Sequence, residues 1–199
     1  MNTTSKPNKF GIAYLRGSRD YVRAIDALTD SPITLSDKSY RVRFHDFGEV
    51  PVHWMPAQEQ QEEGHALAEL TVRNAAGATS WVLVPDPEVS EFQLLPDITF
   101  QLPPPLLSND QEFRIMLLPE LSFWEQVVEA VKIWAKIERP NLRGSVAGAS
   151  GDASCFQPLE KDGQLRLVLG PERMGLTSIS YSYHGKFKGK ILIAAYSTD

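Results

Sequence analysis

Residues 121–138 constrain the fold more than any other segment, because their apolar side chains cover over half of a helical circumference. A helix on a protein surface buries only one stripe, so we expect this helix to be enclosed by other elements. The pattern Ser122-x-x-Glu125 is typical of a capping box, and Pro140 ends the helix. The apolar residues are Leu121, Phe123, Trp124, Val127, Val128, Ala130, Val131, Ile133, Trp134, Ala135 and Ile137.

A faint internal repeat relates the two halves of the chain. A shift of 103 residues without a gap places residues 10–15 over residues 113–118, and both sets alternate as a half-buried strand does. The same shift places residues 21–28 over residues 124–131, which recur at helical spacing. Each half therefore begins with a strand and then a helix, either by duplication or by chance.

The segments that follow each helix have β character. We expect strands over residues 40–46, 50–54, 65–74, 79–84, 156–159, 164–169, 176–183 and 188–196. Turns at residues 74–77, 162–163 and 184–185 predict hairpins, and hairpins join antiparallel neighbours. The small-residue segment 144–155 lacks the ending of a phosphate-binding loop, so we interpret it as a flexible loop able to cover a pocket.

Length and charge limit the remaining possibilities. We divide the 199 residues into a first unit (1–102), a proline-rich spacer (103–111) and a second unit (112–199), and we expect all three to form one compact domain. The net charge of −5 argues against salt-driven attraction to nucleic acid or to anionic membranes. One cysteine, Cys155, cannot form an internal disulfide, and no apolar run has the length of a membrane span. We expect a cytoplasmic protein with Cys155 as a buried structural thiol.

Residues 41–56 hold the densest polar chemistry of the chain. His45 and His53 lie there among acids, aromatics, a glycine and two prolines. Histidine exchanges a proton near neutral pH, and an apolar setting beside a carboxylate tunes it. An alternative use of both histidines is metal binding, with His65 or Glu49 as a third ligand. A third interpretation is a hairpin with histidines paired to acids, and we predict neither a metal nor a cofactor.

The order of these elements resembles the hot-dog fold, in which an antiparallel sheet wraps around a helix. Two fused units predict an α+β double hot dog, and a duplicated vicinal-oxygen-chelate module is the alternative. The segment His45-x-x-Gly48…Pro51-Val52…Met55-Pro56 is similar to the motif of hot-dog dehydratases, with one extra residue before Pro51 and two after Val52.

The resemblance implies site residues and roles. His45 would be the base that removes a proton α to a thioester carbonyl, and the backbone of Gly48 would face that carbonyl. Asp20 or Asp152 would supply the carboxylate. An apolar cavity would be lined by His53, Trp54, Trp124 and Trp134, although core packing is the alternative for the tryptophans.

These observations lead to three candidate functions. The first is a dehydratase or thioesterase-like enzyme acting on acyl chains carried by coenzyme A or by a carrier protein. The second is a non-catalytic module that binds a small hydrophobic ligand or a partner, and a homodimer is compatible with both. The third is a metal-dependent lyase or isomerase.

The alternating residues Lys186, Lys188 and Lys190 suggest a further binding surface. They would suit a diphosphate, an acidic carrier-protein surface or RNA, or else a soluble edge strand.

Overall fold

The computed structural model describes residues 10–13, 23–34, 36–46, 48, 50–60, 65–86, 100–138 and 144–195. The first half contains β1 (Phe10–Ala13), α1 (Ala24–Thr29), β2 (Ser39–Phe44), β3 (Val52–Pro56), η1 (Ala57–Glu59), β4 (Ala68–Asn74) and β5 (Gly77–Pro85). The second half contains β6 (Leu107–Ser108), β7 (Glu112–Met116), α2 (Phe123–Ile137), β8 (Gly144–Asp152), η2 (Ala153–Phe156), β9 (Gln164–Arg173), β10 (Leu176–Tyr183) and β11 (Phe187–Ala195).

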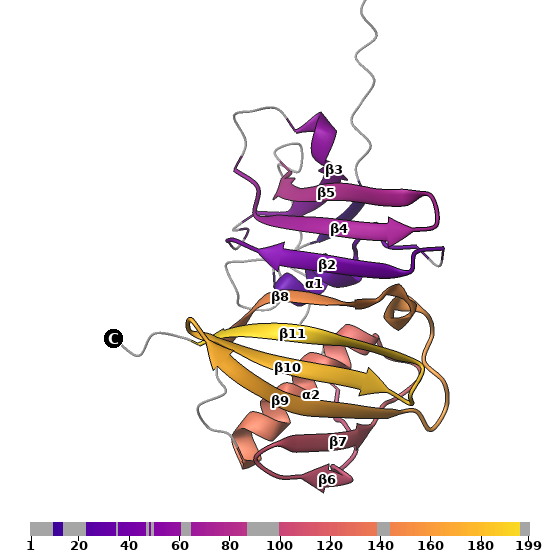
Figure 1. The fold of residues 1–199 in the computed structure, drawn as a ribbon, viewed down its shortest axis with the longest axis vertical. Coiled ribbons are helices and arrows are strands. Elements are labelled where there is room, and N and C mark those ends of the chain that lie inside the picture. The colour runs from indigo at the N-terminus through magenta and orange to yellow at the C-terminus, as the bar shows by residue number, and fades with distance from the viewer. Residues whose placement is uncertain are drawn as a thin grey trace, which may run out of the picture.

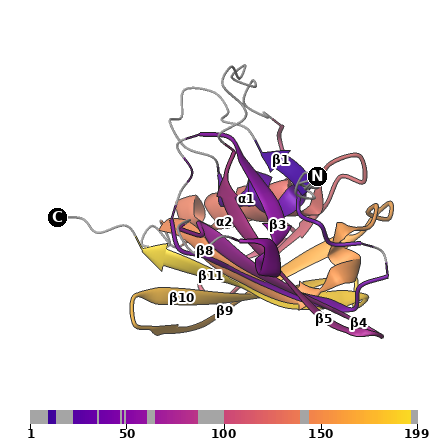
Figure 2. The same cartoon turned by 90° about the horizontal axis from the view of Figure 1, so that it is seen from above.

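The strands form one continuous sheet with the order β1-β3-β5-β4-β2-β8-β11-β10-β9-β7-β6. Every described pair of neighbouring strands is antiparallel, as the hairpin signals predict. The two halves meet where β2 pairs with β8, in the middle of the sheet (Figure 1). Both helices lie on the same side of the sheet, which leaves the other side, the outer face, uncovered by helices (Figure 2).

This α+β architecture confirms the double hot-dog prediction. One strand precedes the helix in the first half and two precede it in the second, and four strands follow the helix in each half, which does not fit the shorter vicinal-oxygen-chelate unit. The repeat also corresponds to real elements, since β1 and α1 take the places that β7 and α2 take in the second half. The inner strands nevertheless differ in order. From the outside of the sheet inward, the first half has β3-β5-β4, whereas the second half has β9-β10-β11.

Helix α2 is buried on one side only, whereas the sequence predicted that other elements would enclose it. Trp124 and Trp134 face the core, whereas Ile137 is 52% exposed and Lys132 and Lys136 face solvent. Ser122 occupies the N-cap position, but its side chain makes no capping hydrogen bond, so the predicted capping box does not form.

The loop before α2 is held by Gln126, which is fully buried. Its amide accepts a hydrogen bond from the backbone N–H of Leu118 at 2.6 Å. It donates to the carbonyls of Leu118 at 2.8 Å and of Leu121 at 3.2 Å. These bonds satisfy buried backbone groups of the loop and so fix the position at which the helix begins.

The small-residue segment is not a loop, because residues 144–152 form β8 at the centre of the sheet. Its glycines allow neighbouring backbones to approach closely. A Cβ on Gly148 would lie 2.8 Å from the carbonyl oxygen of Val42 on β2, and one on Gly144 would lie 1.9 Å from that of Ala194 on β11. The prediction failed because glycine and serine have low β propensity, which packing between two strands overrides.

Two further expectations are corrected. Residues 156–159 form no strand, since η2 ends at Phe156 and an irregular segment follows. The lysine-bearing strand β11 is not an edge strand, because it lies between β8 and β10. Its lysines therefore have no role in protecting a sheet edge.

Candidate functional site

A pocket of about 270 Å³ lies at the N-terminal end of α2, and we call it the Trp124 pocket. Apolar and uncharged side chains dominate its walls. Its described lining residues are Thr29, Pro119, Leu121, Ser122, Phe123, Trp124, Cys155, Phe156, Gln157, Pro158 and Leu159. Residues from α1, α2 and η2 thus meet around one hollow, although they are far apart in sequence.

A buried polar cluster lies beside this pocket, beneath the β2–β8 junction. The hydroxyls of Tyr40 on β2 and Tyr181 on β10 are 2.8 Å apart and form a buried hydrogen bond between the two halves. Burial raises the pKa of both tyrosines. Burial also raises the pKa of Cys155 to about 12, although Tyr40, Tyr181 and Trp124 would each stabilise a thiolate. The two tyrosine hydroxyls and the Cys155 thiol are therefore protonated and neutral near pH 7. Cys155 is not an activated nucleophile.

The three predicted cavity tryptophans differ in the partners of their indole N–H groups. Trp54 donates to the carbonyl of Ala27 at 2.8 Å, and Trp134 donates to that of Asn109 at 2.6 Å. Trp124 is 2% exposed, yet its Nε1 has no acceptor among the described residues. Buried donors are normally bonded, so this N–H stands out among the three indoles; it belongs to a ring that lines the pocket beside Cys155. Trp54 and Trp134 pack in the core, outside the Trp124 pocket.

The predicted base, His45, lies away from this pocket. It follows the end of β2, its side chain is 32% exposed, and its Nε2 lies 3.5 Å from a carboxylate oxygen of Glu69. Tyr40 contacts Trp124, and His45 is five residues farther along the chain, or about 16 Å at strand spacing. Gly48 is buried against Val52 and, like His45, lines none of the three described pockets. The expectation of an apolar hollow beside His45 is not met there, because Glu69 and solvent surround this imidazole.

His53 lies on β3 and is buried beside Asp86, the residue after β5. Its Nδ1 is 3.3 Å from Oδ2 of Asp86, and the two side chains are 6% and 1% exposed. His53 was predicted to line the substrate cavity, and the structure places it outside the Trp124 pocket. The sequence did not suggest Asp86 as its partner, because 33 residues separate them and only the pairing of β3 with β5 brings them together.

Of the two candidate carboxylates, the structure describes only Asp152, which does not line the Trp124 pocket. Asp152 ends β8 and lines a different pocket, where its Oδ2 accepts the backbone N–H of Lys188 at 3.0 Å. Asp20 lies outside the described residues. Within the described ranges, no three His, Cys, Asp or Glu side chains are grouped to hold a metal ion. His65 is exposed, and Glu49 lies outside the described residues.

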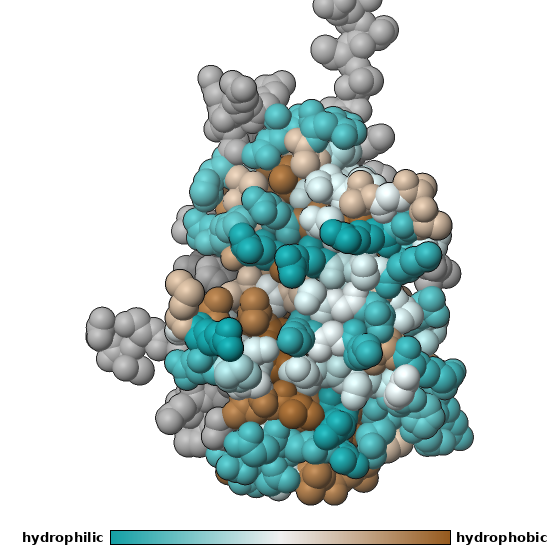
Figure 3. Space-filling model, in the orientation of Figure 1, coloured by the Kyte–Doolittle hydropathy of each residue, from teal (hydrophilic) through white to brown (hydrophobic). Residues whose placement is uncertain are grey.

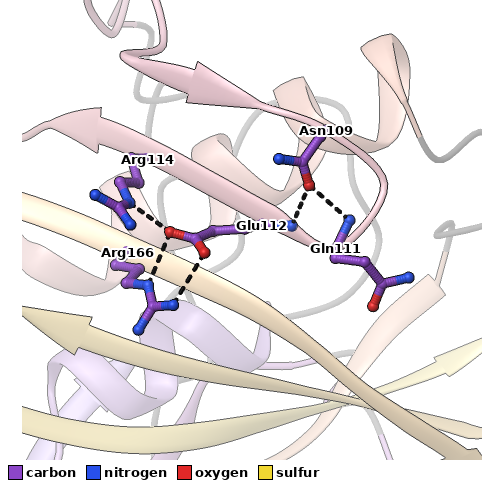
Figure 4. A network of polar contacts seen from close by, with 5 residues as sticks. All are labelled: Asn109, Gln111, Glu112, Arg114 and Arg166. Carbon is purple, nitrogen blue, oxygen red and sulfur yellow. Dashed lines mark hydrogen bonds and ion pairs between the residues drawn. The ribbon is translucent and has the colours of Figure 1, made fainter.

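An ion-pair network connects β7 to β9 (Figure 4). Glu112 on β7 accepts hydrogen bonds from Arg166 at 2.8 and 2.9 Å and pairs with Arg114. These bonds, first from Arg166 and then from Arg114, lower the pKa of Glu112 to about 2. Asn109 fixes the preceding turn by accepting the backbone N–H groups of Gln111 and Glu112, both at 2.9 Å.

Comparisons with known proteins identify similar backbones but no relative by sequence. No family model and no curated protein matches the chain. A TesB protein of Mycobacterium avium subsp. paratuberculosis is 9% identical with a TM-score of 0.49, covering 98% of this chain and 95% of its own.

Two other solved structures show the same kind of similarity. A conserved protein with a hot-dog fold from Alicyclobacillus acidocaldarius is 9% identical, with a TM-score of 0.42 and coverage of 88% and 86%. Acyl-CoA thioesterase II TesB2 of Mycobacterium marinum is 10% identical, with a TM-score of 0.39 and coverage of 87% and 86%. At this identity no residue of the present chain takes a role from them. Among the described helices, none is both long and apolar enough to span a bilayer.

Proposed function

We propose that this chain binds an acyl thioester in the Trp124 pocket and acts on it as a thioesterase- or dehydratase-like enzyme. The substrate class comes from the hot-dog resemblance of the sequence. The observation that carries the proposal is the indole N–H of Trp124, which has no acceptor among the described residues and belongs to a buried ring that lines an apolar pocket. A thioester carries both an apolar chain and a carbonyl acceptor, so it satisfies both features at once.

The donor would serve either reaction. When water attacks a thioester, or when a proton leaves its α carbon, negative charge develops on the same carbonyl oxygen. The N–H of Trp124 would stabilise that charge, and the N-terminus of α2, whose Ser122 side chain provides no cap, adds a favourable dipole. The volume of about 270 Å³ is at the small end for ligand pockets, so we expect short acyl chains to bind best.

A second candidate, a non-catalytic binding module for a small hydrophobic ligand, is favoured by one observation. None of the described residues that line the Trp124 pocket carries a carboxylate or an imidazole, and Cys155 is protonated near pH 7. A base for either reaction would therefore have to come from elsewhere. His45 stays a proposed base on the strength of the motif resemblance alone.

The test uses acyl-CoA thioesters of increasing chain length, with binding measured by calorimetry and turnover by release of free thiol or by dehydration. Trp124→Phe keeps the aromatic ring and removes the N–H, so we expect about a tenfold loss of affinity or of kcat/KM. Trp134→Phe is the matched control, because its N–H is already bonded to Asn109 and lies outside the pocket. His45→Ala should leave binding unchanged.

Each outcome decides between the candidates. Turnover that falls in Trp124→Phe but not in Trp134→Phe supports the enzyme. Binding without turnover in the unmodified protein favours the binding module. Equal behaviour of both tryptophan variants would remove the Trp124 pocket from the function.

A further inference from the structure

The outer face of the sheet carries a basic groove that the proposed function does not use. One pocket of about 560 Å³ lies over β4, β2, β8 and β11, and another of about 480 Å³ lies over β8, β11, β10 and β9. Both are lined by Ser150, Gly151 and Lys188, so they form one groove across the β2–β8 junction. Figure 3 views this face and shows pale, small residues over the central strands with hydrophilic side chains beside them.

The strand register places basic residues on both sides of Ser150, which lines both pockets. Ser150 on β8 lies directly opposite Arg41 on β2 and Lys190 on β11. Because neighbouring strands are about 4.8 Å apart, the backbones of Arg41 and Lys190 lie about 10 Å from each other, on either side of Ser150. On the next outward-facing rung, Arg73 pairs with Ser39 on β2, and Lys188 lies beside Asp152.

The structure describes no ion pair for any of these four side chains. Within the described ranges, Arg41, Arg73, Lys188 and Lys190 make no ion pair with a carboxylate. Arg166, at the far end of the groove, is by contrast held by Glu112. The groove has one lining carboxylate, Asp152, in a chain whose net charge is −5. Free cations concentrated on one face of an acidic protein indicate an anionic ligand.

We propose that this groove binds a small molecule bearing a diphosphate, with one phosphate over Ser150 between Arg41 and Lys190. Guanidinium, ammonium and hydroxyl donors are the groups that bind phosphate oxygens. The second phosphate would lie toward Arg73 and Lys188. The lining residues that the structure describes include no exposed aromatic side chain on which a base could stack, which favours a small diphosphate over single-stranded nucleic acid.

The test is calorimetry with pyrophosphate and with ADP at low ionic strength. We expect saturable binding with a dissociation constant on the order of 0.1 mM. The double variant Arg41→Gln/Lys190→Gln should weaken it by about tenfold or more, and Ser150→Ala by about threefold. The matched control is Lys132→Gln/Lys136→Gln, which removes the same charge from α2 on the opposite side of the sheet.

The remaining outcomes overturn the proposal. Absence of saturable binding of both probes would do so, as would equal losses in the two double variants. Binding of a short single-stranded RNA in place of both probes would assign the groove to nucleic acid. A dimer that dissociates only in Arg41→Gln/Lys190→Gln would assign it to a second copy. Thermal unfolding checks that each variant is folded, and none of these results depends on the Trp124 pocket.

Discussion

The two halves of the sheet share an outline but differ in how they bury their cores. Helix α1 has 6 residues and α2 has 15. The shorter helix contacts both α2 and β8 of the other half, and its Ala27 carbonyl accepts the indole N–H of Trp54. A helix of fewer than two turns cannot cover a sheet alone, so the first half depends on the second for its core.

The aromatic residues are distributed as unevenly as the helices. Phe123 on α2 packs against Trp124, Tyr181, Tyr183 and Phe187, all of which belong to the second half. Tyr40 is the member from the first half that joins this cluster, through contacts with Trp124 and a hydrogen bond to Tyr181. The cluster therefore makes the second half the larger source of hydrophobic stabilisation.

Truncation within the two helices gives the largest expected effect and tests this difference directly. Trp134→Ala removes a fully buried ring that stacks on Phe113, so we expect a loss of about 4 kcal/mol in the free energy of unfolding. Leu28→Ala in α1 should cost about 3 kcal/mol or less. Urea denaturation measures both, and a larger loss from Leu28→Ala would reverse the comparison.

The β2–β8 junction tests whether the halves unfold together. Gly148→Val places a side chain against the backbone of Val42, so we expect a loss of about 2–3 kcal/mol in a single unfolding transition. Ser145→Ala, on the same strand, is the control and should change stability by less than about 0.5 kcal/mol. Two separate transitions in the calorimetric trace would mean that the halves are independent domains.

The smallest expected effect concerns Glu112, whose ion pairs belong to the second half alone. Its folded pKa of about 2 lies below the ordinary value of 4.5, so its stabilisation is complete above pH 4.5 and is lost as the pH falls toward 2. Because Arg114 and Arg166 are well exposed, we expect Glu112→Gln to cost only about 1 kcal/mol at neutral pH. Urea titrations at pH 7 and pH 3 should show the difference between the two proteins shrinking in acid, and a constant difference would exclude this pair as the cause.

Local patterns predicted those elements whose signals are contained within a few residues. The helical spacing of residues 121–138 gave α2 to within two residues at its start, and the turn at residues 74–77 joins β4 to β5. The wrong prediction for residues 144–152 has a physical cause. Residues 144–152 were interpreted as a loop because glycine and serine seldom form strands, yet β8 needs them where backbones on both sides approach closely.

The candidate site was predicted less well than the fold. Trp124 was identified, but as one of several tryptophans, and no pattern in the sequence shows that its indole N–H differs in environment from that of Trp134 on the same helix. The motif around His45 drew the prediction toward an exposed histidine, because a short motif carries no information about what surrounds it. No motif in the sequence marks Gln126, Tyr40 or Tyr181, since a short pattern does not show which groups surround a side chain.

By itself, the amino-acid order of this protein determined the α+β class, the antiparallel pairing and the strand–helix opening of each half, since periodicity and turn residues act over short distances. Only tertiary structure decided the order of the inner strands, the pairing of β2 with β8, and which indole N–H has no acceptor among the residues that the structure describes. Those features depend on contacts between residues far apart in the chain, and such contacts exist only after the two halves have packed together.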